Sequence, residues 1–62
     1  MVSTGELQQY LHGIHYPANK NDLAKTAQGN NAPQDVMDLI DRLPDRKYPS
    51  PVDVNKAVGS ID

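Results

Sequence analysis

The sequence predicts an all-α fold, a compact bundle of four short helices forming one domain over residues 1–62. Three observations support this prediction. Four helix-start patterns are present, in which a short polar side chain precedes an acidic or amide residue by three positions. Apolar residues recur at the i, i+3, i+4, i+7 spacing of one helix face. Gly and Pro follow these apolar stretches, where helices end. The patterns are Ser3-x-x-Glu6, Asn19-x-x-Asp22, Asn31-x-x-Gln34 and Ser50-x-x-Asp53.

The first helix is expected from about Thr4 to His12. Gly13 suits the left-handed position that follows the end of a helix. Pro17 disfavours the helical conformation for Tyr16, so the chain is expected to be extended there. The apolar face of this helix consists of Leu7, Tyr10, Leu11 and Ile14.

Three further helices are expected, beginning at about Lys20, Pro33 and Pro51. Proline suits the first position of the last two helices, because no backbone N–H is needed there. The apolar faces are Leu23 and Ala27 in the second helix, Val36, Leu39, Ile40 and Leu43 in the third, and Val54, Ala57 and Val58 in the fourth.

Residues that interrupt helices follow each of these segments. Gly29 and Asn30, which tolerate positive φ, are expected to end the second helix. Pro44 is expected to end the third helix. Gly59 is expected to close the fourth. The segment between the third and fourth helices is then a polar, charge-dense loop.

A weak internal repeat relates the two halves of the chain. The apolar residues of the first helix match those of the third, 29 positions on. Each half then has a Tyr-Pro dipeptide, Tyr16-Pro17 or Tyr48-Pro49, followed by a helix start. We interpret the chain as two pseudo-repeated helix–loop–helix units packed on each other. The alternative is that two amphipathic helix pairs resemble each other without a repeat.

Composition excludes several classes of protein. The absence of Cys excludes a disulfide framework, a thiolate metal site and a Cys nucleophile. Six basic against eight acidic residues disfavour binding to nucleic acid or to anionic membranes. No apolar run approaches the roughly 20 residues of a membrane span. The N-terminal residues lack the basic and apolar regions of a signal peptide. We therefore expect a cytoplasmic protein.

The sequence predicts neither a metal site nor a catalytic site. His12 and His15 are three positions apart, but Gly13 interrupts the helix between them, and no third ligand accompanies them. The glycines are isolated, so no phosphate-binding loop is present. No nucleophile–His–acid arrangement is supported by the spacing. We therefore expect a protein that is not an enzyme and that needs no cofactor.

Three aspartates recur every three residues along the third helix: Asp35, Asp38 and Asp41. They are explained by the solvated face of an amphipathic helix, or by an acidic rim that docks a basic protein partner. Paired catalytic carboxylates would need a cleft, which so small a domain does not easily enclose. Asp38 and Arg42 also have the spacing of an i, i+4 ion pair. The three aspartates are the candidate partner surface.

Basic residues cluster at the end of the third helix and beyond it. Arg42, Arg46, Lys47 and Lys56 would be the contacts if the third and fourth helices formed a helix-turn-helix. The connecting loop is longer than the usual three to four residues of that motif. The alternative is a solvated loop in which Arg46 pairs with Asp45 or with helix carbonyls. These four residues are the candidate nucleic-acid contacts.

The three tyrosines are the largest side chains. Tyr10 is expected at the edge of the core. Tyr16 and Tyr48 each precede a Pro beside a helix start, where they are expected to pack onto the first turn. Tyr48 follows Arg46 and Lys47, which is also the context of a stacking platform for nucleic-acid bases.

Two segments, Gly13–Leu23 and Leu43–Val54, carry a family resemblance. In this order and at this spacing, they resemble domain-of-unknown-function family 2795, a family of small bacterial proteins. Asn19 stands where Ser or Thr is usual in the family, and Pro33 where an acidic residue commonly opens the third helix. The resemblance implies a bacterial origin and a free-standing all-helical domain. It implies no activity.

The leading functional hypothesis is a non-catalytic helical interaction domain that binds a protein partner or self-associates. It is motivated by the small core, the lack of a catalytic or metal constellation in the sequence, and the asymmetric charge of the third helix. The alternative is a small nucleic-acid-associated regulator, whose binding would weaken steeply with salt.

Overall fold

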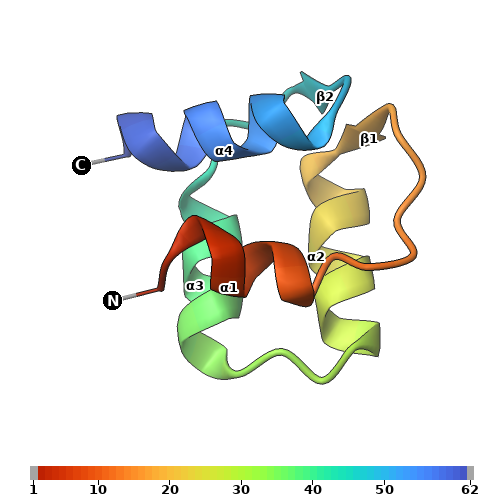
Figure 1. The fold of residues 1–62 in the computed structure, drawn as a ribbon, viewed down its shortest axis with the longest axis vertical. Helices are drawn as coiled ribbons and strands as arrows, with labels where there is room; N and C mark the ends of the chain where they lie inside the picture. The colour runs from red at the N-terminus through yellow and green to blue at the C-terminus, as the bar shows by residue number, and fades with distance from the viewer. Residues whose placement is uncertain (1, 62) are drawn as a thin grey trace.

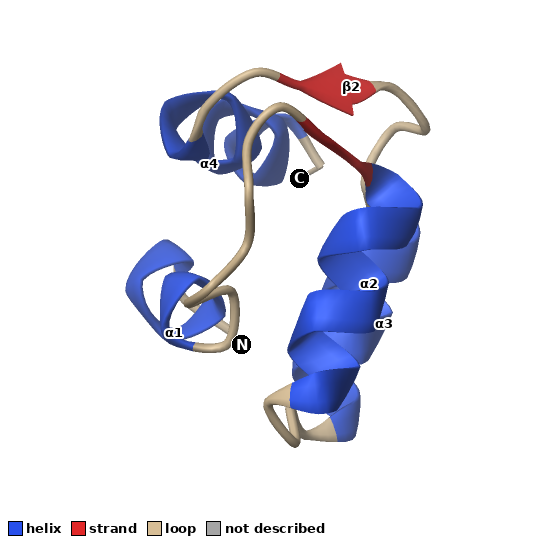
Figure 2. Ribbon diagram, turned by 90° about the vertical axis from the view of Figure 1, so that its right-hand side faces the viewer, coloured by secondary structure: helices blue, strands red, loops and turns tan. Residues whose placement is uncertain are grey.

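The computed structural model describes residues 2–61, which form four helices and a two-stranded antiparallel sheet. Helices α2 and α3 run side by side in opposite directions, and α1 and α4 pack across one side of this pair (Figures 1 and 2). The elements are α1 (Thr4–Gln9), β1 (Ala18–Asn19), α2 (Lys20–Gly29), α3 (Gln34–Arg42), β2 (Lys47–Tyr48) and α4 (Pro51–Ser60).

The small sheet corrects the prediction of an all-α fold. Ala18 pairs with Tyr48, and Asn19 pairs with Lys47. Each strand is only two residues long, too short to produce the alternating pattern by which strands are recognised in a sequence. The sheet joins the two segments that precede α2 and α4, and so fixes where these helices begin relative to each other.

A single hydrophobic cluster occupies the centre of residues 2–61, and no charged side chain of these residues is buried. All four helices and both strands contribute to it, so the predicted apolar faces do form the core. Four residues of these faces are only partly buried at its edge: Tyr10, Ile14, Leu39 and Val58. The buried residues are Leu7, Leu11, Ala18, Leu23, Ala27, Val36, Ile40, Leu43, Tyr48, Val54 and Ala57.

Two of the predicted helix starts are confirmed by their hydrogen bonds. The Ser3 Oγ accepts a hydrogen bond of 3.1 Å from the Glu6 backbone N–H. At α2 both halves of a capping box are present. The Asn19 Oδ1 accepts from the Asp22 N–H at 2.8 Å, and the Asp22 Oδ2 accepts from the Asn19 N–H at 3.1 Å. These bonds satisfy N–H groups that the first helical turn leaves without partners.

The other two predicted caps are wrong in detail. Asn31 has a φ of 61°, and α3 begins at Gln34 with Pro33 in the N-cap position, where proline offers no side-chain acceptor. At α4, Ser50 does occupy the N-cap position. Its hydroxyl, however, donates to the Asp53 Oδ2 at 2.7 Å instead of accepting from the backbone. The start of α4 is therefore where the sequence predicted it, without the predicted bond, whereas α3 begins one residue later than expected and without the Asn31 cap.

Three of the helix ends differ from the predicted ones, whereas α3 ends before Pro44 as expected. Helix α1 ends at Gln9, earlier than expected, and Gly13 takes its predicted left-handed conformation with a φ of 87° only after an intervening turn. Gly29 lies inside α2, and Asn31 takes the left-handed conformation in its place, which a short polar side chain tolerates. Gly59 does not close α4, which continues to Ser60.

Asn30 ties the end of α2 to the turn that follows α1. Its Nδ2 donates to the backbone carbonyls of Tyr10 at 2.8 Å and of His12 at 3.1 Å. These bonds satisfy carbonyls that the early end of α1 leaves without helical partners. They help to hold α1 in position against the α2–α3 pair.

Replacing Asn19 with Ala is expected to lower the free energy of unfolding by about 1 kcal/mol, because the side-chain acceptor for the Asp22 N–H is lost, while the bond from the backbone N–H of residue 19 to Asp22 can still form. In a domain of this size, that corresponds to a fall in Tm of about 4–8 °C. Asn21→Ala is the matched control, since Asn21 is exposed in the same first turn. Thermal unfolding followed by circular dichroism checks the prediction, and equal Tm values for the two variants would contradict it.

Candidate functional site

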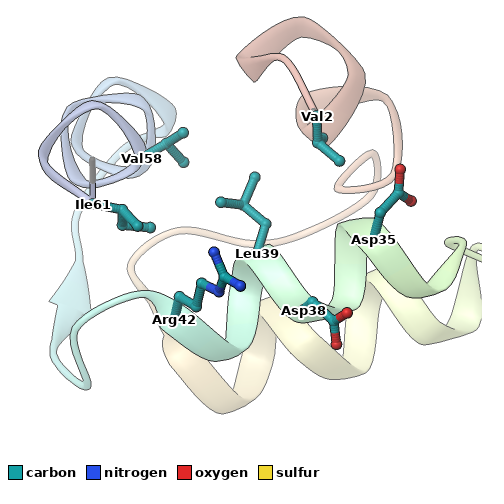
Figure 3. A pocket seen from close by; sticks show the side chains of 7 residues that line it. All are labelled: Val2, Asp35, Asp38, Leu39, Arg42, Val58 and Ile61. Atoms are coloured by element: carbon teal, nitrogen blue, oxygen red, sulfur yellow. The ribbon is translucent and has the colours of Figure 1, made fainter.

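An open groove of about 250 Å³ lies over one flank of α3, between the N-terminal segment and the C-terminal end of α4. Its apolar lining comes from three separate parts of the chain, and its charged lining comes from α3 alone (Figure 3). The apolar residues are Val2, Leu39, Val58 and Ile61, and the charged residues are Asp35, Asp38 and Arg42.

Helix periodicity explains why α3 presents this flank. Successive residues turn by about 100°, so Leu39 lies beside the core-facing side of α3 and not at its centre. Asp35 and Arg42 are seven residues apart, about two turns, and therefore lie on the same flank as Leu39. In Figure 3 the Leu39 side chain points from α3 into the space between Val2 and Val58. Leu39 thus forms the floor of the groove.

The charges are distributed unevenly along the groove. Asp35 lies near Val2, and Arg42 lies near Ile61 at the other end (Figure 3). The Asp35 Oδ1 accepts a hydrogen bond of 2.9 Å from the Val36 backbone N–H in the first turn of α3. A carboxylate there is also favoured by the helix dipole. One end of the groove is therefore negative and the other positive.

Asp38 makes a different contact from the one that its spacing suggested. Its Oδ1 accepts a hydrogen bond of 2.8 Å from the Gln34 Nε2, one turn earlier on α3. Figure 3 shows the carboxylate pointing away from Arg42, the expected i, i+4 partner. The guanidinium of Arg42 extends along the groove beside Leu39. Both charged groups are thus presented at the exposed surface.

Asp41, the third aspartate of the predicted partner surface, does not line the groove. It is six residues after Asp35, which turns it about 120° away around the helix axis. Its backbone carbonyl accepts a hydrogen bond of 2.6 Å from the Lys20 Nζ of α2. The predicted acidic surface is therefore divided, with Asp35 and Asp38 at the groove and Asp41 outside it.

The four predicted nucleic-acid contacts lie on different elements. Arg42 is in the groove with two of the aspartates, Lys47 is on β2, and Lys56 is on α4. The guanidinium of Arg46 lies over the Tyr48 ring, with its Cζ 5.8 Å from the ring centre. This is cation–π geometry, and it differs from the pairing with Asp45 that was one alternative. Tyr48 is 0 % exposed, so its ring offers no platform for a base.

The histidines are exposed and lie after α1. The backbone carbonyl of His12 accepts one of the Asn30 bonds, whereas His15 lines a second, more open hollow of about 370 Å³ with Asp22 and Lys25. Among residues 2–61, no group of three or more His, Asp or Glu side chains is placed to hold a metal ion.

Tyr16 carries a polar atom that the fold leaves unsatisfied. Its hydroxyl is buried and, within residues 2–61, is the one buried side-chain nitrogen or oxygen that has no hydrogen-bond partner. Burial raises the pKa of the Tyr16 phenol above its usual value, because the charged form loses contact with water. The ring itself packs at the edge of the core.

Replacing Tyr16 with Phe is therefore expected to leave stability at pH 7 unchanged or raised by up to about 1 kcal/mol. A second expectation concerns alkaline pH. Because the folded-state pKa is raised, the unfolded chain releases this proton first as pH increases above about 10, so wild-type stability falls there. The variant lacks this contribution. Urea unfolding at pH 7 and above pH 10 measures both effects, and a destabilised variant at pH 7 would contradict the prediction.

The apolar walls of the groove were not anticipated from the sequence. Val58 has the spacing of a core residue, and Val2 and Ile61 lie outside the predicted helices. No local pattern joins these residues, because tertiary packing brings the two ends of the described chain to the same flank of α3 (Figure 1).

Within residues 2–61, none of the helices is both long and apolar enough to cross a membrane.

Comparison with protein families identifies a family for this chain. A family model described as "Protein of unknown function (DUF2795)" matches residues 2–55. The matched region includes both segments that carry the sequence resemblance, and it ends before the groove residues Val58 and Ile61. No curated protein and no solved structure matches the chain.

Proposed function

The chain belongs to the DUF2795 family of proteins of unknown function, and from its surface we propose that it is a non-catalytic interaction domain. In this proposal the groove over α3 binds another protein chain, either a different protein or a second copy. The supporting observation is the groove itself, which combines a partly exposed apolar floor with charged edges. Apolar patches with polar rims are typical of protein interaction sites.

The partial exposure of Leu39 supports this assignment. Leu39 and Val58 belong to the apolar faces of their helices, yet neither is fully covered by the core. A partner side chain seated in the groove would complete their burial, with a gain of about 25 cal/mol for each Å² of apolar surface removed from water. Truncating Leu39 or Val58 would therefore weaken binding of the partner more than it weakens the fold.

The charges at the groove favour a partner with a basic group beside its apolar contact. Asp35 at one end of the groove and Asp38 along its edge are exposed and would attract such a group, which raises association rate and selectivity. Arg42 at the other end would accept an acidic group. A stable interface covers about 800 Å² on each partner, about a fifth of the 3937 Å² accessible surface. The groove would thus be the centre of a contact extending over neighbouring parts of α3 and α4.

Affinity capture from a lysate of the source organism tests this proposal. The tagged protein is compared with Asp35→Lys/Asp38→Lys and with Asp41→Lys/Asp45→Lys, a control with the same charge change outside the groove. All samples are treated with nuclease. We expect a defined protein that the wild type and the control retain and the groove variant loses. A partner retained equally by all three would contradict the assignment to the groove.

A second proposal is a nucleic-acid-associated regulator that uses the basic residues around β2. The exposure of Arg46, Lys47 and Lys56 supports it. The net charge of −2 and the burial of Tyr48 weigh against it. Binding of this kind would weaken steeply as salt increases. A gel shift at low ionic strength that Arg46→Glu/Lys47→Glu abolishes would support it, whereas the absence of any shift would exclude it.

Two further features also belong to the proposal. The order helix–strand–helix occurs twice along residues 2–61, and the two strands pair with each other, which supports the interpretation as two pseudo-repeated units. Bacterial origin is supported by the family resemblance, and a cytoplasmic location is proposed from the polar composition, which has a mean hydropathy of −0.67.

A further inference from the structure

We propose that the groove of one copy receives the outer face of α4 from a second copy, centred on Val52, so that the chain self-associates head to tail. This inference rests on the proposed function of the groove and names its occupant. Three features support it: the exposure of Val52, the position of Lys56 on the same helix face, and the matching spacing of the groove residues.

Val52 is the one large apolar side chain of residues 2–61 that is strongly exposed, with 58 % of its surface accessible. It lies in the first turn of α4. Lys56 and Gly59 follow at four and seven positions, so all three lie along one face of the helix, and all are exposed. This outer face forms a narrow ridge with an apolar end and a basic group one turn later.

The ridge and the groove of one molecule cannot meet. Val58 lines the groove and is six residues after Val52 on the same helix, so the two side chains point about 120° apart around its axis. Contact between ridge and groove therefore requires two copies. A convex ridge fills a hollow better than a second hollow would, which favours a contact between these unlike surfaces over a contact between two grooves. Such contacts form rings or open chains.

The charges and spacings of the two surfaces are complementary. Val52 and Lys56 are four residues apart on α4, and Leu39 and Asp35 are four residues apart in the reverse direction on α3. Four residues correspond to about 6 Å along a helix. With α4 of one copy antiparallel to α3 of another, Val52 reaches the floor at Leu39 when Lys56 reaches Asp35. Asp38, also exposed at the groove, adds to the attraction for Lys56.

Sedimentation velocity over a concentration series tests the inference. We expect wild-type protein to associate with increasing concentration, and Val52→Asp to weaken association about tenfold or more. Asp35→Lys/Asp38→Lys is expected to weaken it similarly. Each variant damages a different side of the contact, so an equimolar mixture should form a 1:1 complex that grows no further. Val52→Thr provides a second ridge variant, because threonine has nearly the same shape as valine. Circular dichroism confirms that each variant is folded.

Several results would overturn self-association. One is that the wild-type protein stays monomeric at millimolar concentration. Another is that a folded Val52→Asp variant associates like the wild type. The third is that a mixture of the two variants stays monomeric. Self-association can fail while the proposed function of the groove stands. If a captured partner is lost by Asp35→Lys/Asp38→Lys but retained by Val52→Asp, the groove is an interaction site, and its occupant is a different protein.

Discussion

The Tyr48→Ala variant is expected to lose a large part of the domain's stability at 25 °C. Tyr48 is 0 % exposed and is the largest of the fully buried side chains in residues 2–61. Truncating a buried aromatic residue costs about 3–5 kcal/mol. At roughly 0.05–0.15 kcal/mol per residue, a domain of this length has only about 3–9 kcal/mol of stability. One substitution therefore removes at least about a third of this stability, and all of it at the lower end of the range.

Tyr48→Phe is the matched control, because it keeps the ring and removes only the hydroxyl. That hydroxyl donates to the Pro44 carbonyl at 2.5 Å, so the loss should be about 1 kcal/mol. Urea unfolding followed by circular dichroism measures both variants. If Tyr48→Ala unfolded at the same urea concentration as Tyr48→Phe, the ring on β2 would not be a main support of the core.

The second large effect is expected at the groove. Replacing Leu39 with Ala should weaken the binding of the captured partner, or of a second copy, about thirtyfold, which corresponds to about 2 kcal/mol at the centre of an interface. Leu39 forms the floor of the groove and is only partly covered by the core. Its truncation should therefore cost less stability than truncation of a fully buried leucine, for which 2–5 kcal/mol is typical.

Met37→Ala is the matched control for this prediction. Met37 is also partly buried on α3, but it lies on another side of the helix and does not line the groove. We expect it to lower stability without weakening binding. Titration calorimetry with the purified partner, or sedimentation for self-association, distinguishes the two variants. Equal binding by both would show that the groove floor contributes nothing to recognition.

The sequence predicted the helices well because their signals are local. The capping box of Asn19 and Asp22 forms as its spacing indicated, and Pro51 begins α4. The sheet was missed because pairing of Ala18 with Tyr48 joins residues 30 positions apart in strands of two residues. Propensity cannot reveal such a pair, since tertiary packing of the two Tyr-Pro segments brings it together.

The candidate site was predicted in part. Asp35 and Asp38 were proposed as a partner surface, and both lie at the groove. Arg42 was assigned to a different hypothesis, nucleic-acid binding, yet the structure places it in the same groove. The helical period could have shown that these residues share a flank with Leu39. The helical period could not have shown that Val2 and Ile61 line the groove, because they reach that flank only through the packing of α1 and α4.

Photo-crosslinking tests most directly whether the groove is the interaction surface. A benzophenone amino acid is introduced in place of Asp35 at the groove, or in place of Arg46 beside β2, since both positions are exposed. Each protein is irradiated in nuclease-treated lysate, and the crosslinked products are identified by mass spectrometry. We predict a defined protein adduct, with a partner or a second copy, from position 35 and not from position 46. Adducts from position 46 alone would contradict the assignment of the groove as the binding site.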